Sequence, residues 1–369
     1  MTWGGSQVRI LYRAHIMIIL GIETSCDETA LALIETRGSG DSFECRVISS
    51  LIHSQAELHS PYGGVFPTLA KREHEKNLPL LLEQIMKGRD KPDMIAVTEG
   101  PGLEPALWTG IVFAEKLGEE WRVPVIPVNH MEGHVVGSLL ESDAPMGVWQ
   151  QLKPLPLPAL ALLISGGHTE LVKVSGIGQY EIIGQTKDDA VGEAFDKAAR
   201  LLGLPYPGGP HLSRLAAEAR DAHIQSLVKL PRPMISSKDL AFSFSGLKTA
   251  VLYAIRDAEK AGTNTDEFKK SLAQEFEDAV TETLDAKLQA AIEQTGAQSI
   301  IVGGGVSANV HLRTQFEKTA TEYSIPLYLP SQHISGDNAL MIALAGALNG
   351  VKSPESGRPL RAHGTKKLG

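Results

Sequence analysis

Two histidines four residues apart are the clearest candidates for chemistry in this sequence. His130 and His134 lie in the stretch NHMEGHVVG, and positions i and i+4 share one face of a helix, so both imidazoles can reach one metal ion. Zinc peptidases use the same spacing but keep a glutamate directly after the first histidine as general base. Here that position is Met131, and Glu132 is turned by about 100° around the helix. The pattern favours a metal over peptidase chemistry, and two structural histidines remain an equally good interpretation.

A third metal ligand is offered by Asp337 in the stretch HISGDNALMIALAG. Two imidazoles and one carboxylate leave coordination positions open, which suits a metal that must grip a substrate. An aspartate before an apolar helix is also a favoured N-cap. The sequence does not decide between these roles, because nothing in it shows that the three residues meet.

Three glycine-rich turns, ISGGHTE, YPGGP and VGGGVSAN, are candidates for anion binding. Glycines let backbone amides approach a phosphate closely, and a turn that leads into a helix adds the positive end of the helix dipole. Three such turns in one half of the chain favour a nucleotide pocket, although neither a P-loop nor a G-x-G-x-x-G motif is present. Asp196, in VGEAFDKAARLLG, could accept hydrogen bonds from a ribose, whereas Glu193 and Lys197 have the spacing of a surface ion pair.

Strands and helices alternate around these residues, which favours an α/β fold. The segments IILGIETSCDETALALIE and ALALLISGGHTELVKV both have the pattern of a β-hairpin. This repetition suggests two related halves. The proline-rich stretch at 144–160 is the best boundary between them.

Composition indicates a globular protein with local rather than global basic character. The chain has 369 residues and a net charge of −8, so an RNA ligand would need a local basic patch. Two cysteines do not make a disulfide scaffold, and no stretch approaches the roughly 20 apolar residues of a membrane helix. We therefore expect a cytoplasmic protein without membrane insertion. The candidate RNA contacts are Lys71, Arg72, Lys76, Arg361, Lys366 and Lys367.

Nine motifs occur in one order from residue 17 to about 349: GIETSCDET, HSQAELHSPYGGVFPTLAKREHEKNLP, VTEGPGL, NHMEGH, LLISGGHTEL, GEAFDKAARLLGLPYPGGP, FSFSGLKTA, VGGGVSAN and GDNALMIA. With these motifs the sequence resembles the bacterial TsaD family, the tRNA N6-adenosine threonylcarbamoyltransferases. The resemblance implies an actin-like ATPase (ASKHA) fold of the α/β class, with two ribonuclease H-like halves and a cleft between them.

The resemblance also implies an activity and partners. The expected enzyme transfers threonylcarbamoyl from threonylcarbamoyl-AMP to N6 of the adenosine 3′ of the anticodon, in tRNAs that read ANN codons. The expected partners are tRNA, a TsaB-like paralogue and a TsaE-like ATPase. A metallopeptidase, a kinase of the same fold and a non-catalytic scaffold are the alternatives.

Matched motif by motif, the resemblance assigns roles to residues of this chain. One divalent ion, iron or zinc, is expected on His130, His134 and Asp337, while Asp27 and Glu28 are the candidate catalytic acids. The adenylate is expected at Leu163, Ile164, Ser165, Gly166, Gly167, Asp196, Gly209 and Asn309. The expected organisation is a disordered extension (1–16), a first lobe with the histidines (17–150), a second lobe with the glycine turns (151–330), a return to the first lobe (331–351) and a flexible tail (352–369).

Overall fold

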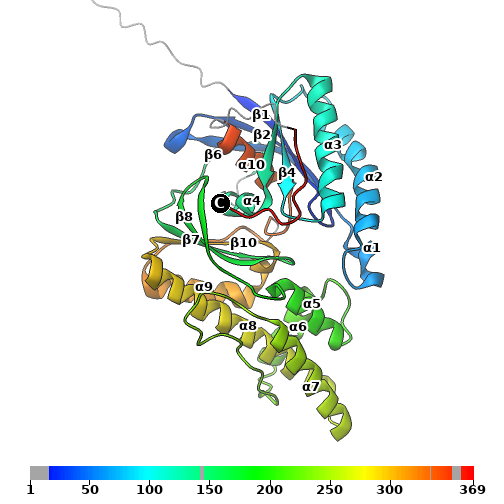
Figure 1. Ribbon diagram of the computed structural model, residues 1–369, viewed down its shortest axis with the longest axis vertical. Helices are drawn as coiled ribbons and strands as arrows, with labels where there is room; N and C mark the ends of the chain where they lie inside the picture. The colour runs from blue at the N-terminus through cyan, green and yellow to red at the C-terminus, as the bar shows by residue number, and fades with distance from the viewer. Residues whose placement is uncertain (1–15, 142–144, 333, 351–358) are drawn as a thin grey trace, which may run out of the picture.

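Two β-sheets form the framework of the protein, as seen in a computed structural model that describes residues 16–141, 145–332, 334–350 and 359–369 (Figure 1). The first sheet has the order β5-β4-β1-β2-β3-β6. Its strands are β1 (Met17–Glu23), β2 (Glu28–Arg37), β3 (Glu44–Ser54), β4 (Met94–Gly100), β5 (Val125–Asn129) and β6 (Gln150–Gln151). Strands β1, β2 and β3 are antiparallel, and β4 and β5 continue the sheet in parallel with β1.

The second sheet repeats this plan with the order β11-β10-β7-β8-β9. Its strands are β7 (Ala159–Ile164), β8 (Thr169–Gly176), β9 (Gln179–Gln185), β10 (Ser299–Gly303) and β11 (Leu327–Tyr328). Strands β7 to β9 are antiparallel, while β10 and β11 are parallel with β7. Each predicted hairpin is thus the start of a three-stranded meander. The repeated topology confirms the expected actin-like architecture of two ribonuclease H-like halves.

Helices cover both faces of the first sheet, so its central strands are largely apolar. Along β1, Ile19 packs toward α10 (Ala339–Gly350), whereas Leu20 and Ile22 pack toward the helices on the opposite face. That opposite face carries α2 (Pro67–Met86) and α3 (Glu104–Trp121), and the short α1 (Ala56–His59) precedes them. The alternation follows from the two-residue repeat of a strand.

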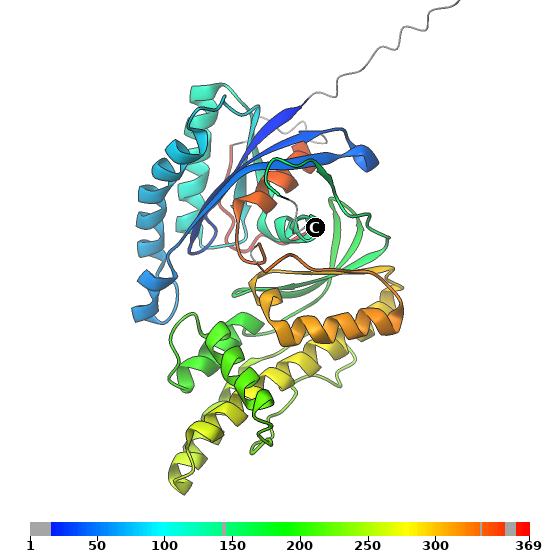
Figure 2. The ribbon, with the colours of Figure 1, turned by 180° about the vertical axis from the view of Figure 1, so that it is seen from behind.

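The second sheet is built in the same way. From β7, Leu160 and Leu162 point into the core beneath the helices, while Ala161 and Leu163 point toward α4 (His130–Gly137). Seen from behind, the remaining helices lie on the side of this sheet away from α4 (Figure 2). These helices are α5 (Val191–Leu201), α6 (Gly208–Asp221), α7 (Ser245–Ala261), α8 (Asp266–Thr295) and α9 (Val310–Tyr323).

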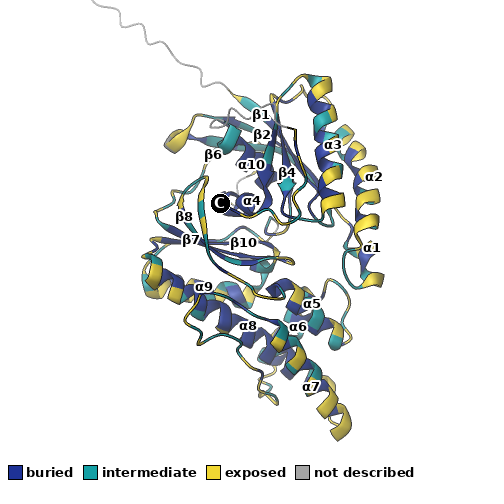
Figure 3. Cartoon of the chain, viewed as in Figure 1, coloured by how far each residue is buried: buried dark blue, intermediate teal, exposed yellow. Residues whose placement is uncertain are grey.

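Helices α4 and α10 lie between the two sheets, and Figure 3 shows both as buried. Because α4 carries the histidine pair, the fold places these side chains at the junction of the two lobes. No helix in the described ranges is long and apolar enough to cross a membrane.

Of the flexible tail expected at 352–369 from its Gly/Pro/Lys-rich composition, residues 352–358 lie outside the described residues. Residues 359–369, which we name the strap, do not match this expectation. Leu360 and Leu368 are buried, and His363 N donates to Glu99 O at 2.9 Å. The strap is therefore a packed element. Of the predicted extension at 1–16, only Ile16 lies within the described residues, and it is exposed.

Candidate functional site

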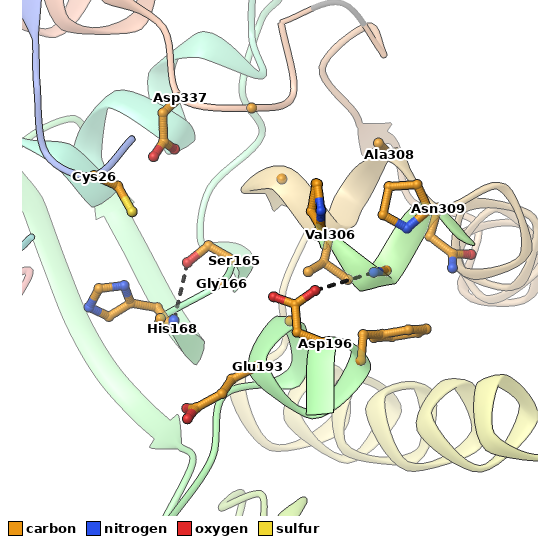
Figure 4. A pocket seen from close by; sticks show the side chains of 18 of the residues that line it. Cys26, Ser165, Gly166, His168, Glu193, Asp196, Val306, Ala308, Asn309 and Asp337 are labelled. Carbon is orange, nitrogen blue, oxygen red and sulfur yellow. Dashed lines mark hydrogen bonds between the residues drawn. The ribbon is translucent and has the colours of Figure 1, made fainter. Parts of the chain in front are cut away.

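A cleft of about 1570 Å³ lies between the lobes, and residues from distant parts of the chain line it. In Figure 4, Asp337, Ser165 and Asp196 follow one another across this space. Of the residues expected to hold the metal, bind the adenylate or act as acids, those that line the cleft are Asp27, Glu28, His130, Ser165, Gly166, Gly167, Asp196, Gly209, Asn309 and Asp337.

The histidine pair is fixed by the way α4 begins. Strand β5 ends at Asn129, whose Oδ1 accepts hydrogen bonds from Met131 N at 2.9 Å and Glu132 N at 3.4 Å. This N-cap satisfies amides that have no partner within the helix. It starts the helix at His130, so the first and second turns present His130 and His134 side by side, with ring centroids 4.7 Å apart.

Asp337 completes a group of three potential ligands. Its Oδ1 lies 3.2 Å from Nε2 of His130 and 3.2 Å from Nε2 of His134. One ligand atom from each of the three residues lies within 4.8 Å of the others, and both histidines are 4% exposed. The alternative role of Asp337 as N-cap is filled by its neighbour, because Asn338 Oδ1 accepts from Met341 N at 3.0 Å.

The donor set fits a divalent metal such as iron or zinc, which readily takes two imidazoles and a carboxylate. His134 Nε2 is buried but makes no hydrogen bond of normal geometry within the described part of the chain. A buried nitrogen in this state is costly unless a partner is supplied. The residues therefore match what a metal site requires.

A second group of side chains behind His130 orients its ring. His130 Nδ1 lies 3.0 Å from Glu23 Oε2 and 3.2 Å from Ser25 Oγ, and Thr98 Oγ1 donates to Glu23 Oε2 at 2.6 Å. A carboxylate on one ring nitrogen directs the other toward the ligand position. We did not single out Glu23 from the sequence; the available signal was a carboxylate at the end of an otherwise apolar strand.

The carboxylates of Glu23 and Asp337 make this buried group a favourable place for positive charge. Burial acts to lower the pKa of His130, but the carboxylates of Asp337 and Glu23 outweigh it and raise that pKa well above the usual value. Burial also lowers the pKa of His134, and the opposing effect of Asp337 is too small to reverse this shift. Burial acts to raise the pKa of Asp337, and the charge of His130 outweighs it and lowers that pKa. An imidazolium or a bound cation meets this demand.

The glycine turns lie across the cleft from the histidines. Ser165, Gly166 and Gly167 form the turn between β7 and β8, whereas Leu163 and Ile164 are fully buried in β7 and do not line the cleft. Those two residues support the turn from within the sheet. Their expected part in adenylate binding stays a prediction, and their side chains do not line the cleft.

Asp196 organises the start of α6. Its Oδ1 accepts from Gly208 N at 2.7 Å and from Gly209 N at 3.3 Å, and a Cβ at Gly208 would lie 2.4 Å from Ala199 Cβ. Only glycine allows α6 to approach α5 this closely. Asp196 Oδ2 makes no hydrogen bond within the described ranges, so it is available to a hydroxylated ligand.

Asn309 belongs to a polar network that we did not identify from the sequence. Its Oδ1 caps α9 by accepting from Leu312 N at 3.0 Å, and its Nδ2 donates to Ser213 Oγ at 2.8 Å and Glu277 Oε1 at 2.7 Å. Glu277 is also paired with Arg220 at 2.5 Å. Ser213, Arg220 and Glu277 all line the cleft. No sequence signal marked them, because they lie inside helices with ordinary periodicity.

Two further acids line the cleft. Asp27 and Glu28 are half-buried at the start of β2. Burial, followed by the charges of Asp27 and Asp337, raises the pKa of the Glu28 carboxyl well above its usual value. Glu28 can therefore exchange a proton nearer to neutral pH than an exposed glutamate can.

Glu132 is occupied elsewhere. Its Oε1 accepts from Tyr180 Oη at 2.9 Å, and its Oε2 accepts from Asn349 Nδ2 at 2.7 Å. The carboxylate thus ties α4 to β9 and α10, and both of its oxygens have partners. It is not placed as the general base of a peptidase.

The fold has counterparts among solved structures. Full-length HypF, in a phosphate- and nucleotide-bound form, superimposes with a TM-score of 0.54 at 13% identity, over 93% of this chain and 48% of HypF. HypF of T. kodakarensis gives a TM-score of 0.52 at 12% identity, over 92% of this chain and 48% of that one. This chain thus spans about half of HypF, and the likeness concerns the fold alone.

Sequence relatives extend over nearly the whole chain. The tRNA N6-adenosine threonylcarbamoyltransferase of Aromatoleum aromaticum is 44% identical over 92% of this chain and 94% of the relative. The enzyme of the same name from Methylobacillus flagellatus is 47% identical over 90% and 92%. The TsaD family profile, described as tRNA N6-adenosine threonylcarbamoyltransferase, matches residues 46–344. With this coverage by the profile and by the relatives, the chain belongs to the TsaD family.

Proposed function

We propose that the protein transfers a threonylcarbamoyl group from threonylcarbamoyl-AMP to N6 of the adenosine 3′ of the anticodon, in tRNAs that read ANN codons. The observation that supports this most is that one cleft contains both a group of potential metal ligands and the glycine turns. Three potential metal ligands come from the first lobe and the segment 334–338, and the glycine turns come from the second lobe. A kinase of the same fold would use an acid rather than a histidine pair at the point of transfer.

The metal is proposed to be iron or zinc, held by His130, His134 and Asp337. When bound there, it would supply a Lewis acid that polarises the carbamoyl carbonyl. Glu23 holds the His130 ring with Nε2 toward the site, and Asn129 sets the helical turn that carries both imidazoles. These residues fix the geometry before substrate arrives, which limits reorganisation during the reaction.

The adenylate is proposed to lie against the turn at Ser165–Gly167, with Asp196 Oδ2 accepting from ribose. Ser165, Gly166 and Gly167 line the cleft, and the backbone amides of such a glycine turn suit a phosphate. Gly209 lines the cleft beside Asp196. In the transfer, N6 forms a bond to the carbamoyl carbon, the bond from that carbon to the phosphate oxygen breaks, and AMP leaves. Asp27 and Glu28 are the proposed acceptors of the N6 proton.

The partners are proposed from the family alone. They are tRNA, a TsaB-like paralogue and a TsaE-like ATPase, in the cytoplasm. Co-purification of the protein with each candidate, in the presence and absence of tRNA, tests them separately.

Replacing either histidine tests the central proposal. His130→Ala and His134→Ala should each lower the bound metal and abolish formation of threonylcarbamoyladenosine, while circular dichroism shows a folded protein. His223→Ala, at an exposed position that does not line the cleft, is the matched control and should keep both properties. Full tRNA modification by either site variant would contradict the proposed role of the pair.

A further inference from the structure

The strap joins the two lobes across the cleft. Leu360 is 7% exposed and packs in the core between the first sheet and α2 and α3. Leu368 is 4% exposed and packs against α4 and the second sheet. In Figure 1 the red end of the chain accordingly runs past β4 and α4 to the second lobe. The two apolar anchors of the strap therefore belong to different lobes.

The middle of the strap is fixed to the turn after β4. His363 N donates to Glu99 O at 2.9 Å, and Gly102 N donates to Gly364 O at 3.2 Å. The Lys366 ammonium is paired with the Glu99 carboxylate, which is only 12% exposed. A Cβ at Gly100 would lie 2.1 Å from His363 O, so the backbones meet without room for a side chain.

Two chains of contacts lead from the strap to the histidine pair. In the first, Asn129 Nδ2 donates to Lys367 O at 3.1 Å, while Oδ1 of the same side chain caps α4. In the second, the turn held by the strap continues to Leu103, whose N donates to Ser25 O at 2.8 Å. Ser25 Oγ then lies 3.2 Å from His130 Nδ1. The strap thus supports both the helix that carries the ligands and the ring of the first ligand.

We propose that the strap is a positioning element of the metal site, with Asn129 as its direct link. The inference rests on the proposed metal group of His130, His134 and Asp337. Ligands must be held within about 0.5 Å of a productive geometry by the residues around them. Because one side chain caps α4 and holds the strap, release of the strap leaves the Asn129 amide free to rotate, and the first turn of α4 loosens. A strap that only filled an apolar groove would affect global stability but not metal affinity.

The link can be cut without removing the cap. Asn129→Ser keeps a favoured N-cap oxygen but loses the amide that reaches Lys367 O. Lys366→Met keeps the aliphatic stem and removes the ion pair with Glu99. Arg361→Met is the matched control on the same strap, because Arg361 is exposed and does not line the cleft. Zinc affinity is measured by competition with a chelator in the absence of tRNA, and amide hydrogen exchange is followed over residues 130–137.

Both link variants should bind zinc about tenfold more weakly, within the range known for residues that support metal ligands. They should also show faster exchange in α4 at an unchanged global unfolding midpoint, whereas Arg361→Met should match the wild type. Unchanged zinc affinity and exchange in both link variants would overturn the proposal.

A truncated chain that ends at residue 358, and so lacks the strap, provides a second test. If it folds, it should lose zinc affinity to at least the same extent, and wild-type affinity in this folded chain would overturn the proposal. If it does not fold, the two point variants decide. Because exchange in α4 is measured without metal or tRNA, failure of the transferase proposal would be seen separately, as wild-type protein that modifies no tRNA.

Discussion

At the scale of single residues, Glu132 distinguishes transferase from peptidase chemistry. Glu132→Gln should retain metal and tRNA modification, because the carboxylate binds Tyr180 and Asn349 rather than the cleft. The amide keeps one acceptor for Tyr180 but turns a donor toward Asn349, so we expect a stability loss of about 1 kcal/mol. Metal analysis, a modification assay and chemical denaturation measure the three effects. A rate loss on the order of 10² or more, as for removal of a general base, would contradict this assignment.

His74, behind the acids of the cleft, gives the protein a dependence on pH. Its Nε2 donates to Cys26 O at 3.0 Å, and Thr29 Oγ1 donates to Nδ1 at 2.8 Å. Burial lowers the pKa of His74 below the usual 6.5, so on acidification the unfolded chain takes up the proton first. The contribution of neutral His74 to the free energy of unfolding is therefore complete above pH 6.5. It is lost as pH falls toward the pKa of His74 in the folded protein.

The free energy of unfolding should consequently fall below pH 6.5, and less steeply in His74→Gln. Urea denaturation at several pH values measures both slopes. Identical slopes in the two proteins would show that His74 does not bind its proton differently in the folded state.

At the scale of elements, the contact of β1 with α10 leaves no room for a side chain. A Cβ at Gly21 would lie 2.2 Å from Ala339 O and 2.9 Å from Ala343 Cβ. Gly21→Ala should therefore destabilise the protein by about 1–3 kcal/mol, as overpacking does. Gly246→Ala, with nothing within 4 Å of the added Cβ on exposed α7, is the control and should cost nothing, because alanine favours a helix. Chemical denaturation compares the two, and equal midpoints would contradict tight packing here.

Elements with a local sequence pattern could be predicted, whereas elements held by distant contacts could not. Strands β1 and β7 and helix α4 have local signals, namely apolar runs, turns and histidine spacing. The strap has none, because its two leucines are separated by polar and glycine residues and find partners only in the folded lobes. The sequence also left open whether Asp337 caps the helix or joins the metal group, because tertiary contacts decide; in the structure Asn338 is the cap. The Glu277 network needs three helices in place before its residues meet.

At the scale of the whole molecule, the net charge of −8 leaves tRNA attraction to local groups. Of the predicted contacts, Lys71 is paired with Glu75 at 3.7 Å and Lys76 with Glu73 at 3.3 Å, and Lys366 is paired with Glu99. Exposed Arg72 and Arg361 and cleft-lining Lys367 are therefore the better candidates, and we test Arg72 and Lys367. The double variant Arg72→Glu, Lys367→Glu should weaken tRNA binding and reduce the slope of log K against log salt by about 2.

Lys260→Glu, on the exposed last turn of α7, is the control. Filter binding at several salt concentrations gives the slopes, and adenylate binding should stay the same in all variants. Equal tRNA affinity of the double variant and the wild type would exclude Arg72 and Lys367 from the interface.

The position of α10 in the chain has a consequence for synthesis. This helix covers one face of the first sheet, yet it follows the entire second lobe in sequence. At the usual speed of translation, the roughly 210 residues between β5 and α10 take on the order of ten seconds or more to emerge from the ribosome. Until then the apolar face of β1 and β4 lacks the cover that α10 provides, so we expect the nascent first lobe to need chaperones. We expect a chain released before residue 339 to leave the same face exposed and to be degraded faster than the full chain.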